Sequence, residues 1–289
     1  IAATAVNKGF LTSAENIDVE FTKPKYFFNK SVYDNRVYQG FGKADTSVEL
    51  KLGPNITDWP EMVALPENLL VKVVSLITDP VTTTDELIPS GETSSYRSNP
   101  LGLAEFTLSR KDPAYVGRAK EVQVAEKAIE AGNCPSQAFP EVKPIMDTIK
   151  TKFTISRDVM GIGSTIFAVK PGDGSAREQA ASCQKVLGGW ANIAREYATK
   201  RYRSNLINWG MLPFIFDEEN LPFENGDYVF IPQVAQGIKD KKSEFTAYVV
   251  RNGEMKEFTL KMGELTDDER EIILAGCLIN YNRNKNKNK

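Results

Sequence analysis

The sequence contains no histidine and only three cysteines among its 289 residues. A chain without histidine cannot form a Ser-His-Asp triad, a histidine-ligated zinc site or a histidine general base. Cys134, Cys183 and Cys277 are widely separated, and none belongs to a Cys-x-x-Cys pair of the kind that binds zinc or an iron–sulfur cluster. We therefore expect three free thiols, buried in a protein of the reducing cytosol, and a cytoplasmic location.

An excess of one charge and long apolar runs are also missing. The chain has 36 basic and 38 acidic residues and a net charge of −2, which excludes a generally basic nucleic-acid-binding protein. No apolar run reaches the roughly 20 residues of a membrane span, so we expect no membrane partner. The 41% hydrophobic and 26% charged content is that of a globular protein with a proper core.

The first 68 residues differ from the rest. They are rich in aromatic side chains but show no sustained periodicity, and glycines and prolines interrupt them. We interpret 1–68 as a long connecting segment with short strands, and 69–289 as the folded domain. The chain begins at Ile1 without a methionine, so we expect a fragment of a longer protein or a processed chain.

From residue 70 onward, expected strands and helices alternate, which predicts an α/β domain with some antiparallel sheet. The first strand, 70–77, has the pattern of a half-buried strand, and the helix 113–131 can be capped by Asp112. Further strands are expected at 165–169, near 192, at 213–216 and at 227–231, with helices at 176–187, 200–209 and 266–276. Strands 245–250 and 255–260 flank an Asn-Gly turn and form a hairpin.

The segment Val169–Glu178 carries the strongest chemical signal. It runs from a strand through a loop with two glycines into a helix, so the backbone can turn sharply and a ligand can come close. Ser175 stands where the helix is expected to begin, and free amides and the positive end of the helix dipole meet there. Arg177 adds a cation shaped for a carboxylate or phosphate. The pattern predicts an anion site with a hydroxyl at its centre.

A purely structural explanation of this segment is also open: Ser175 as a helix cap, the glycines as turn formers and Arg177 in a surface ion pair. It is not a phosphate-binding P-loop, because the Gly-Lys-Ser/Thr ending is absent. Other candidates have similar alternatives. Asp85, in Thr83-Thr84-Asp85, is a site or a turn residue; Arg97 is a ligand-binding or a solvated loop residue. The run Lys200–Arg203 is a basic patch or a solvated helix face.

Several motifs in order resemble the C-terminal third of the aconitase family. Gly172–Glu178 reads Gly-Asp-Gly-Ser-Ala-Arg-Glu, close to the family's Gly-Glu-Gly-Ser-Ser-Arg-Glu. Thr83-Thr84-Asp85 and Arg97 stand at the family's spacing. The motifs Leu187–Gly189, Ser204–Leu206, Gly210–Phe214 and Ala275–Asn280 continue in the family's order. The resemblance covers nearly the whole chain and is strongest from about 70 to 280.

The resemblance implies a fold and an activity. The fold is the α/β swivelling β/β/α domain of the aconitase and isopropylmalate isomerase small-subunit type, a mixed sheet with flanking helices. The activity is a hydro-lyase reaction, the reversible dehydration of a hydroxy-polycarboxylic acid. Carried over by position, Ser175 is the catalytic base in its alkoxide form, and Arg97 and Arg177 bind substrate carboxylates. Ala176 lies in the substrate-binding loop, and Asp85 supports the site.

The resemblance also implies a [4Fe–4S] cluster that belongs to the parent enzyme and is bound by an upstream domain, on the same polypeptide. None of the three cysteines is at a ligand position, so this fragment alone should be cluster-free and inactive. Its partners would be the hydroxy-acid substrate and the upstream domains. The family's second loop serine is Ala176 here, and the histidine after the family's aspartate is Glu86. These departures argue against citrate and isocitrate and predict a divergent aconitase-like hydratase.

Two other functions are considered. A non-catalytic module derived from this domain would bind anions or dock a partner, and Ala176 is the residue that favours it. RNA binding would use Lys200–Arg203 and the basic tail, but the net charge of −2 makes nucleic acid a poor partner.

Overall fold

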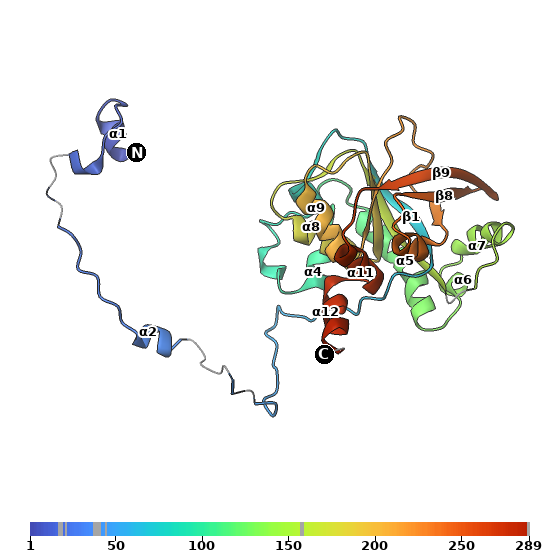
Figure 1. Cartoon of the computed structure of the whole chain (residues 1–289), viewed down its shortest axis with the longest axis horizontal. Helices are drawn as coiled ribbons and strands as arrows, with labels where there is room; N and C mark the ends of the chain where they lie inside the picture. The colour runs from blue at the N-terminus through green and yellow to red at the C-terminus, as the bar shows by residue number, and fades with distance from the viewer. Residues whose placement is uncertain (17–19, 21, 37–41, 44, 157–158, 288–289) are drawn as a thin grey trace. The chain divides into compact units, whose positions relative to one another are not determined.

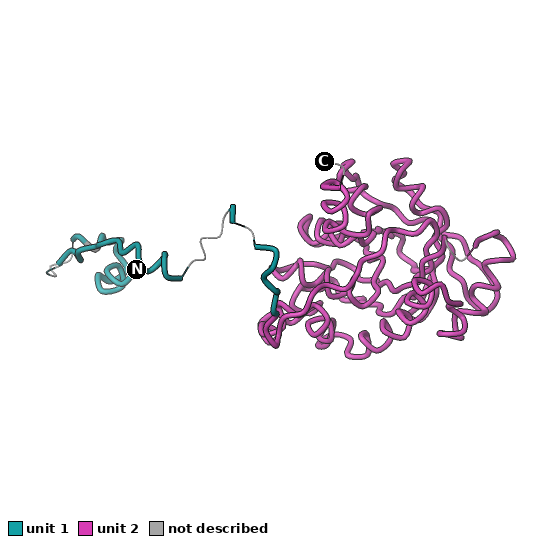
Figure 2. The backbone as a smooth tube through the Cα atoms, turned by 90° about the horizontal axis from the view of Figure 1, so that it is seen from below, with its two compact units in different colours: residues 1–51 teal, residues 52–289 magenta. Residues whose placement is uncertain are grey.

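The computed structural model describes residues 1–16, 20, 22–36, 42–43, 45–156 and 159–287. The chain divides into two compact units, residues 1–51 and 52–289, which Figure 2 distinguishes by colour. Each unit is described by itself.

Unit 1, residues 1–51, contains only short helical segments among its described residues. They are α1 (Ala2–Val6), η1 (Ala14–Asn16) and α2 (Ser31–Asp34). No residue of α1 or α2 is buried, and Phe28 stacks on Tyr33 with their ring centroids 5.4 Å apart. The prediction of short strands in this segment is therefore wrong for the described part of unit 1. Part of the predicted segment 1–68 lies outside the described residues.

Unit 2 begins before the predicted domain start at residue 69, because residues 52–67 pack on the body of the unit. We call these residues the strap. The Leu65 amide donates to the Leu274 carbonyl at 3.1 Å, and Asn280 donates to the Met62 carbonyl at 2.6 Å. Trp59 lies against Trp209, with a distance of 4.4 Å between ring centroids. The assignment of 1–68 as an interdomain linker stays a prediction.

Seven of the described strands of unit 2 form a closed barrel in the order β1-β3-β5-β6-β9-β8-β7. Pairing is parallel from β1 through β3 and β5 to β6, and antiparallel around the rest of the ring. The strands are β1 (Asn68–Ile77), β3 (Met160–Ala168), β5 (Gly189–Ala194), β6 (Leu212–Ile215), β7 (Tyr228–Ile231), β8 (Glu244–Arg251) and β9 (Glu254–Met262). The predicted α/β fold with a mixed sheet is confirmed.

Strand β1 is buried on both faces, so the prediction of a half-buried strand is wrong. Leu69, Val71 and Val73 join the hydrophobic cluster inside the barrel, whereas Leu70 and Val74 join the cluster between barrel and helices. Its one lysine, Lys72, is accommodated by an ion pair of 2.6 Å with Glu141. Alternate side chains of one strand thus hold two cores together.

Helices cover the parallel side of the barrel. Figure 1 shows α4, α8 and α9 grouped on one side and α6 and α7 on another. The helices are α3 (Thr84–Leu87), α4 (Pro100–Ala104), α5 (Tyr115–Glu130), α6 (Pro135–Ala138), α7 (Val142–Lys150), α8 (Arg177–Val186), α9 (Lys200–Asn208), α10 (Val234–Lys239), α11 (Asp267–Ala275) and α12 (Leu278–Lys287), with the short η2 (Ser94–Tyr96). Within the described part of the chain, no helix has both the length and the apolar character needed to cross a membrane.

Two predicted features that adjacent residues encode, a hairpin turn and a capping box, are confirmed. Asn252 and Gly253, both at positive φ, form the hairpin turn between β8 and β9, and Thr266 and Glu269 form the capping box of α11. The predicted Asp112 cap of α5 is wrong, because that helix begins at Tyr115 without a side-chain cap. Asp112 instead accepts hydrogen bonds from Ser75, at 2.6 Å, and from Arg118.

Two opposite charges are buried between α5 and α8. Burial raises the pKa of Glu126 from 4.5 to about 7 and lowers the pKa of Lys185 from 10.5 to about 8. From about pH 4.5 to 7 the folded chain holds more protons at Glu126 than the unfolded chain does, so the unfolding free energy falls as pH rises. Between about pH 8 and 10.5 the unfolded chain holds more protons at Lys185 than the folded chain does. In this range Lys185 therefore makes the unfolding free energy rise with pH.

We predict that Glu126→Gln gains stability over the wild type as pH rises from 5 to 8, by about 2 kcal/mol at pH 8. The glutamine keeps an acceptor for the Ile162 amide, which donates to Glu126 at 2.6 Å, but it never ionises. Urea unfolding of both proteins across this pH range measures the difference. Glu121→Gln, an exposed change on the same helix, should show no such trend. Parallel pH curves for wild type and Glu126→Gln would contradict the prediction.

Candidate active site

The loop between β3 and α8 is held by a second, two-stranded sheet. β4 (Pro171–Asp173) pairs in parallel with β2 (Thr82–Thr83), which leads directly into α3. Thr83 caps α3 in a capping box with Glu86. The predicted Thr83-Thr84-Asp85 motif and the predicted Gly-Asp-Gly-Ser loop are therefore brought side by side.

Two glycines let this loop pass between buried neighbours. At Gly172, φ is +98°, and a Cβ would lie 2.3 Å from the ring of Tyr202. At Gly174, φ is +128°, and a Cβ would lie 2.2 Å from Thr84 Oγ1. Thr84 Oγ1 also accepts a hydrogen bond of 3.3 Å from the Ala176 amide. The loop needs glycine at both positions, for backbone conformation and for space.

Tyr202 is the fixed support of the loop. Its side chain is fully buried, and its hydroxyl accepts hydrogen bonds from Gln184 at 3.0 Å and from Asn192 at 2.8 Å. Burial raises its pKa, so the phenol stays neutral. Thr199, which caps α9, donates to the Gly172 carbonyl at 3.2 Å. The loop conformation is thus determined from α9 as well as from α3.

Ser175 does not cap the following helix. α8 begins at Arg177, its N-cap residue is Ala176, and no side chain caps it. Ser175 is exposed, and its hydroxyl makes no hydrogen bond that the described residues supply. The structural explanation that Ser175 caps the helix is therefore wrong, and its hydroxyl is available to contact a ligand.

Ser175 lies where two shallow hollows meet. The first, of about 260 Å³, is lined by Ser175, Ala176, Arg97, Ser90, Glu178 and Gln179. The second, of about 380 Å³, is lined by Ser175, Arg177, Glu178 and four residues of α9: Lys200, Arg201, Ser204 and Asn205. Four of the five predicted site residues thus border this one surface, and only Asp85 does not.

Arg177 has an unused hydrogen-bond donor. Its Nε is buried and has no partner among the described residues, and it takes part in none of the ion pairs found in that part of the chain. The structural explanation that places Arg177 in a surface ion pair is therefore wrong as well. A buried donor without an acceptor is costly, and a bound carboxylate would supply the acceptor.

The basic residues of α9 are a part of the site that the sequence indicated only weakly. Lys200 and Arg201 are exposed and line the second hollow together with Arg177. The single acid there is Glu178, which already accepts a hydrogen bond of 3.1 Å from Trp209. Three cations against one acid make this hollow suited to an anion with several carboxylates.

Arg97 and Asp85 differ in their placement. Arg97 follows η2, is exposed and makes one long hydrogen bond of 3.4 Å to the Ser90 carbonyl, so its guanidinium remains accessible to a ligand. Asp85 is paired with Arg110 at 2.6 Å, and Arg110 also binds Glu92 at 2.6 Å. This triad ties α3 to the segment that leads to Arg97. A supporting role of Asp85 stays a prediction.

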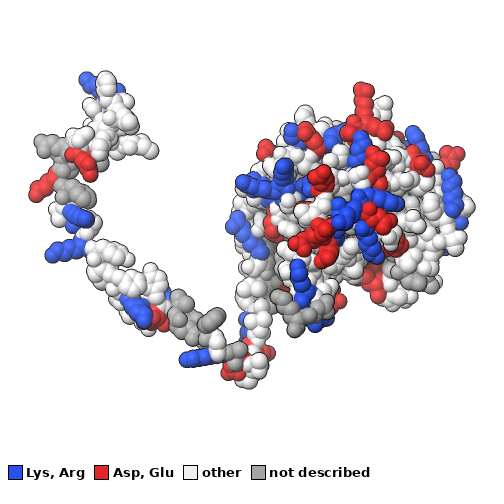
Figure 3. Space-filling model, in the orientation of Figure 1, with Lys and Arg blue, Asp and Glu red and all other residues white. Residues whose placement is uncertain are grey.

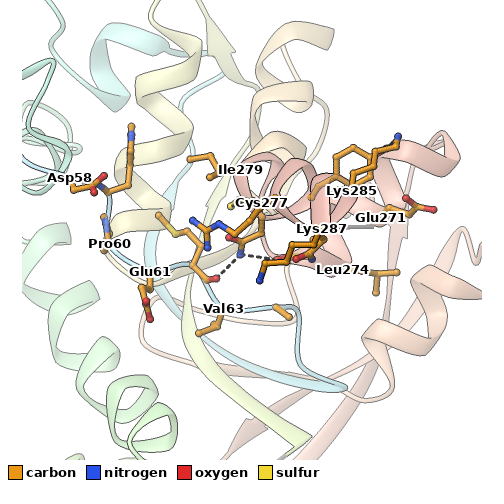
Figure 4. A pocket seen from close by; sticks show the side chains of 18 residues that line it. Asp58, Pro60, Glu61, Val63, Glu271, Leu274, Cys277, Ile279, Lys285 and Lys287 are labelled. Atoms are coloured by element: carbon orange, nitrogen blue, oxygen red, sulfur yellow. Dashed lines mark hydrogen bonds between the residues drawn. The ribbon is translucent and has the colours of Figure 1, made fainter. Parts of the chain in front are cut away.

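A larger hollow lies elsewhere and contains none of the predicted residues. It has a volume of about 940 Å³ and lies between the strap and the helices α11 and α12, as Figure 4 shows. Asn280 crosses it with hydrogen bonds to the carbonyls of Met62 and Ala275. Its lining contains carboxylates and cations but no unpaired buried polar side chain of the described residues. We therefore place the candidate site at Ser175.

Charges on the surface are mixed. On the face of unit 2 drawn in Figure 3, acidic and basic side chains are interspersed. That face offers no broad basic field for a nucleic-acid backbone.

Comparison with known proteins finds a family match that includes the candidate site loop. Residues 124–219 match the family model of the aconitase C-terminal domain, a range that includes the whole Gly172–Glu178 loop and α9. The chain is 32% identical over 126 residues to aconitate hydratase A of Rickettsia bellii. It is homologous to the aconitases. The resemblance seen in the sequence is thereby confirmed for the matched part of the chain.

A second homologue is the methanogen homoaconitase small subunit of Methanocaldococcus jannaschii, which is 36% identical over 110 residues. The matched regions cover 42% and 38% of this chain, and 14% and 55% of the two relatives. A solved structure, 3-isopropylmalate dehydratase of Methanocaldococcus jannaschii, aligns with a TM-score of 0.47 and 21% identity over 76% of this chain and 96% of that chain. This aconitase homologue thus spans only part of the curated proteins that it matches.

We predict that Gly172→Ala lowers the unfolding free energy by about 2–4 kcal/mol, because the new methyl group overlaps the Tyr202 ring at a positive φ. Thermal or urea unfolding measures the loss. Gly117→Ala is the matched control: it lies in α5 with nothing within 4 Å of its added carbon. That change should stabilise the chain by about 0.5–1 kcal/mol. Equal effects of the two changes would contradict the described loop.

Proposed function

We propose that this chain is the swivel-domain part of an aconitase-like hydro-lyase that acts on a hydroxy-polycarboxylic acid. In this proposal, residues 69–289 form the swivel domain and 1–68 connect it to an upstream domain of the same polypeptide in the cytoplasm. The observation that carries the proposal is the free Ser175 hydroxyl beside the unpaired Arg177, within residues that match the aconitase C-terminal domain.

The proposed chemistry needs a strong base at Ser175. Its alkoxide would take the proton α to a carboxylate, and the electron pair would form the double bond as the β-hydroxyl departs. A serine alkoxide requires strong positive potential. Arg97, Arg177 and the amino end of α8 supply such potential around the hydroxyl.

The substrate carboxylates would be held by arginines on either side of Ser175. Arg97 borders the first hollow and Arg177 the second, so an acid that spans the serine can reach both. Ala176 contributes only its backbone, whose amide is already directed to Thr84. A hydroxyl at this position would add a hydrogen bond to a carboxylate, and its absence supports a substrate other than citrate or isocitrate.

The proposed [4Fe–4S] cluster does not fit the described residues of this chain. They contain no group of three or more Cys, Asp or Glu side chains close enough to hold a metal ion, and the free Cys183 and Cys277 are buried. In the proposal the cluster therefore belongs to the upstream domain, and this chain alone catalyses nothing.

We predict that Ser175→Ala in the full-length, cluster-loaded parent enzyme lowers kcat by about 10²–10⁴-fold, because the base is lost. Turnover of a panel of hydroxy-di- and tricarboxylic acids measures the effect, and the cluster absorbance should be unchanged. Ser243→Ala, an exposed serine before β8, is the control and should retain full activity. Unchanged turnover in Ser175→Ala would overturn the assignment of the base.

The alternative of a non-catalytic anion-binding module remains a second proposal, favoured by Ala176. The variant Arg177→Lys distinguishes the two proposals, because lysine keeps the positive charge but cannot donate the bidentate hydrogen bonds of a guanidinium group. A catalytic site should show KM raised about 10–100-fold. A binding module should show no hydratase activity in the wild-type parent, but weaker binding of a tricarboxylate such as tricarballylate in Arg177→Lys by calorimetry.

A further inference from the structure

A separate cavity lies on the other end of α8 from Ser175, between α5, α8, the start of β5 and the strap. Its volume is about 410 Å³. Its rim is exposed and includes Glu61, Glu105, Lys120, Lys127 and Glu130, whereas its floor is formed by buried residues. The cavity therefore opens to solvent at its rim and has a buried floor.

Two opposite charges lie in this floor. Lys185 is 6% exposed and Glu126 is 7% exposed, beside Trp190 at 2%. Glu126 accepts a hydrogen bond of 2.6 Å from the Ile162 amide and a second one from the Trp190 side chain, which leaves part of its acceptor capacity unused. Glu130 and Glu61, at the rim, interact electrostatically with each other, and both Glu126 and Glu130 interact with Lys185.

The amine of Lys185 has no hydrogen-bond partner among the described residues. Its Nζ lies 3.7 Å from the centroid of the Trp190 ring, a contact that offers a cation no acceptor atom. A buried ammonium normally finds an acceptor, because leaving its donors unsatisfied is costly. The cavity thus presents one ammonium group without a hydrogen-bond acceptor. Its lining has one carboxylate more than it has cations: Glu61, Glu105, Glu126 and Glu130 against Lys120, Lys127 and Lys185.

This arrangement excludes the simplest ligands. A plain anion would satisfy Lys185 but would face the carboxylates of Glu61, Glu126 and Glu130. A plain cation would satisfy those carboxylates and leave Lys185 without an acceptor. The described residues contain no group suited to a metal ion. The remaining wall is apolar, formed by Pro60, Met62, Val63, Leu101, Val186 and Leu187.

We propose that this cavity binds a neutral aliphatic α-amino acid. Its carboxylate accepts from Lys185, its ammonium group faces Glu126 and the rim carboxylates, and its side chain packs on the apolar wall. A volume of about 410 Å³ accommodates such a molecule. The proposal does not depend on the proposed hydro-lyase activity, because the site is separate from Ser175 and its test measures binding only.

The test uses the full 289-residue chain and L-leucine as the probe, with calorimetry and thermal unfolding. Binding of one leucine per chain should raise Tm by about 5–10 °C at a hundredfold excess over Kd. Two fragments of leucine test the charges: 4-methylpentanoate lacks the ammonium group, and 3-methylbutylamine lacks the carboxylate. Each should bind at least tenfold more weakly than leucine. Absence of any leucine binding, or equal binding of all three compounds, would overturn the proposal.

Two variants locate the site. Lys185→Met keeps the shape of the side chain and removes its charge, and Glu126→Gln removes the facing carboxylate; each should weaken leucine binding at least tenfold. Lys143→Gln is the matched control, because Lys143 is also paired with a carboxylate, Asp147 at 2.6 Å, but lies on α7, outside the lining of this cavity. It should bind leucine like the wild type. Unchanged binding in both floor variants would place leucine elsewhere and refute the assignment. If Lys185→Met fails to fold, Glu126→Gln and the two fragments still decide it.

Discussion

The candidate site depends on one steric constraint: the loop before α8 must pass between Tyr202 and Thr84. Both neighbours are anchored, Tyr202 by two buried amides and Thr84 by the capped helix α3. Because neither can move aside, the two glycines leave the loop one path, and Ser175 emerges at the junction of the two hollows. An exposed serine in a flexible loop would lose orientation; here its backbone is set by packed elements on both sides.

The barrel explains why these elements are rigid. Parallel strands β1, β3 and β5 carry the loops of the site at their carboxyl ends, and the antiparallel strands close the ring behind them. Since β1 contributes to two hydrophobic clusters at once, the helix layer and the barrel interior share a wall. A shift of α8 or α9 would therefore disturb the packing of the barrel as well.

The sequence alone predicted what short-range chemistry determines. The Asn252–Gly253 turn, the Thr266 capping box and the sharp glycine turn before Ser175 are predictable because a few adjacent residues define them. The second buried face of β1 was missed, because its polar residues Lys72 and Ser75 find partners far along the chain, Glu141 and Asp112. For the same reason Asp112 does not cap α5. Lys200 and Arg201 resembled an ordinary solvated face, because only the placement of α9 against the loop brings them to the site.

The strap connects the beginning of unit 2 to its end. Leu65 binds Leu274, and Met62 binds Asn280, so the first residues of the unit are fastened to its last two helices. A pull on residue 52 is therefore shared between the two ends of the fold and does not act on β1 alone. Unit 2 is thereby held together as one piece at both of its ends, so the geometry around Ser175 is preserved when the unit moves as a whole.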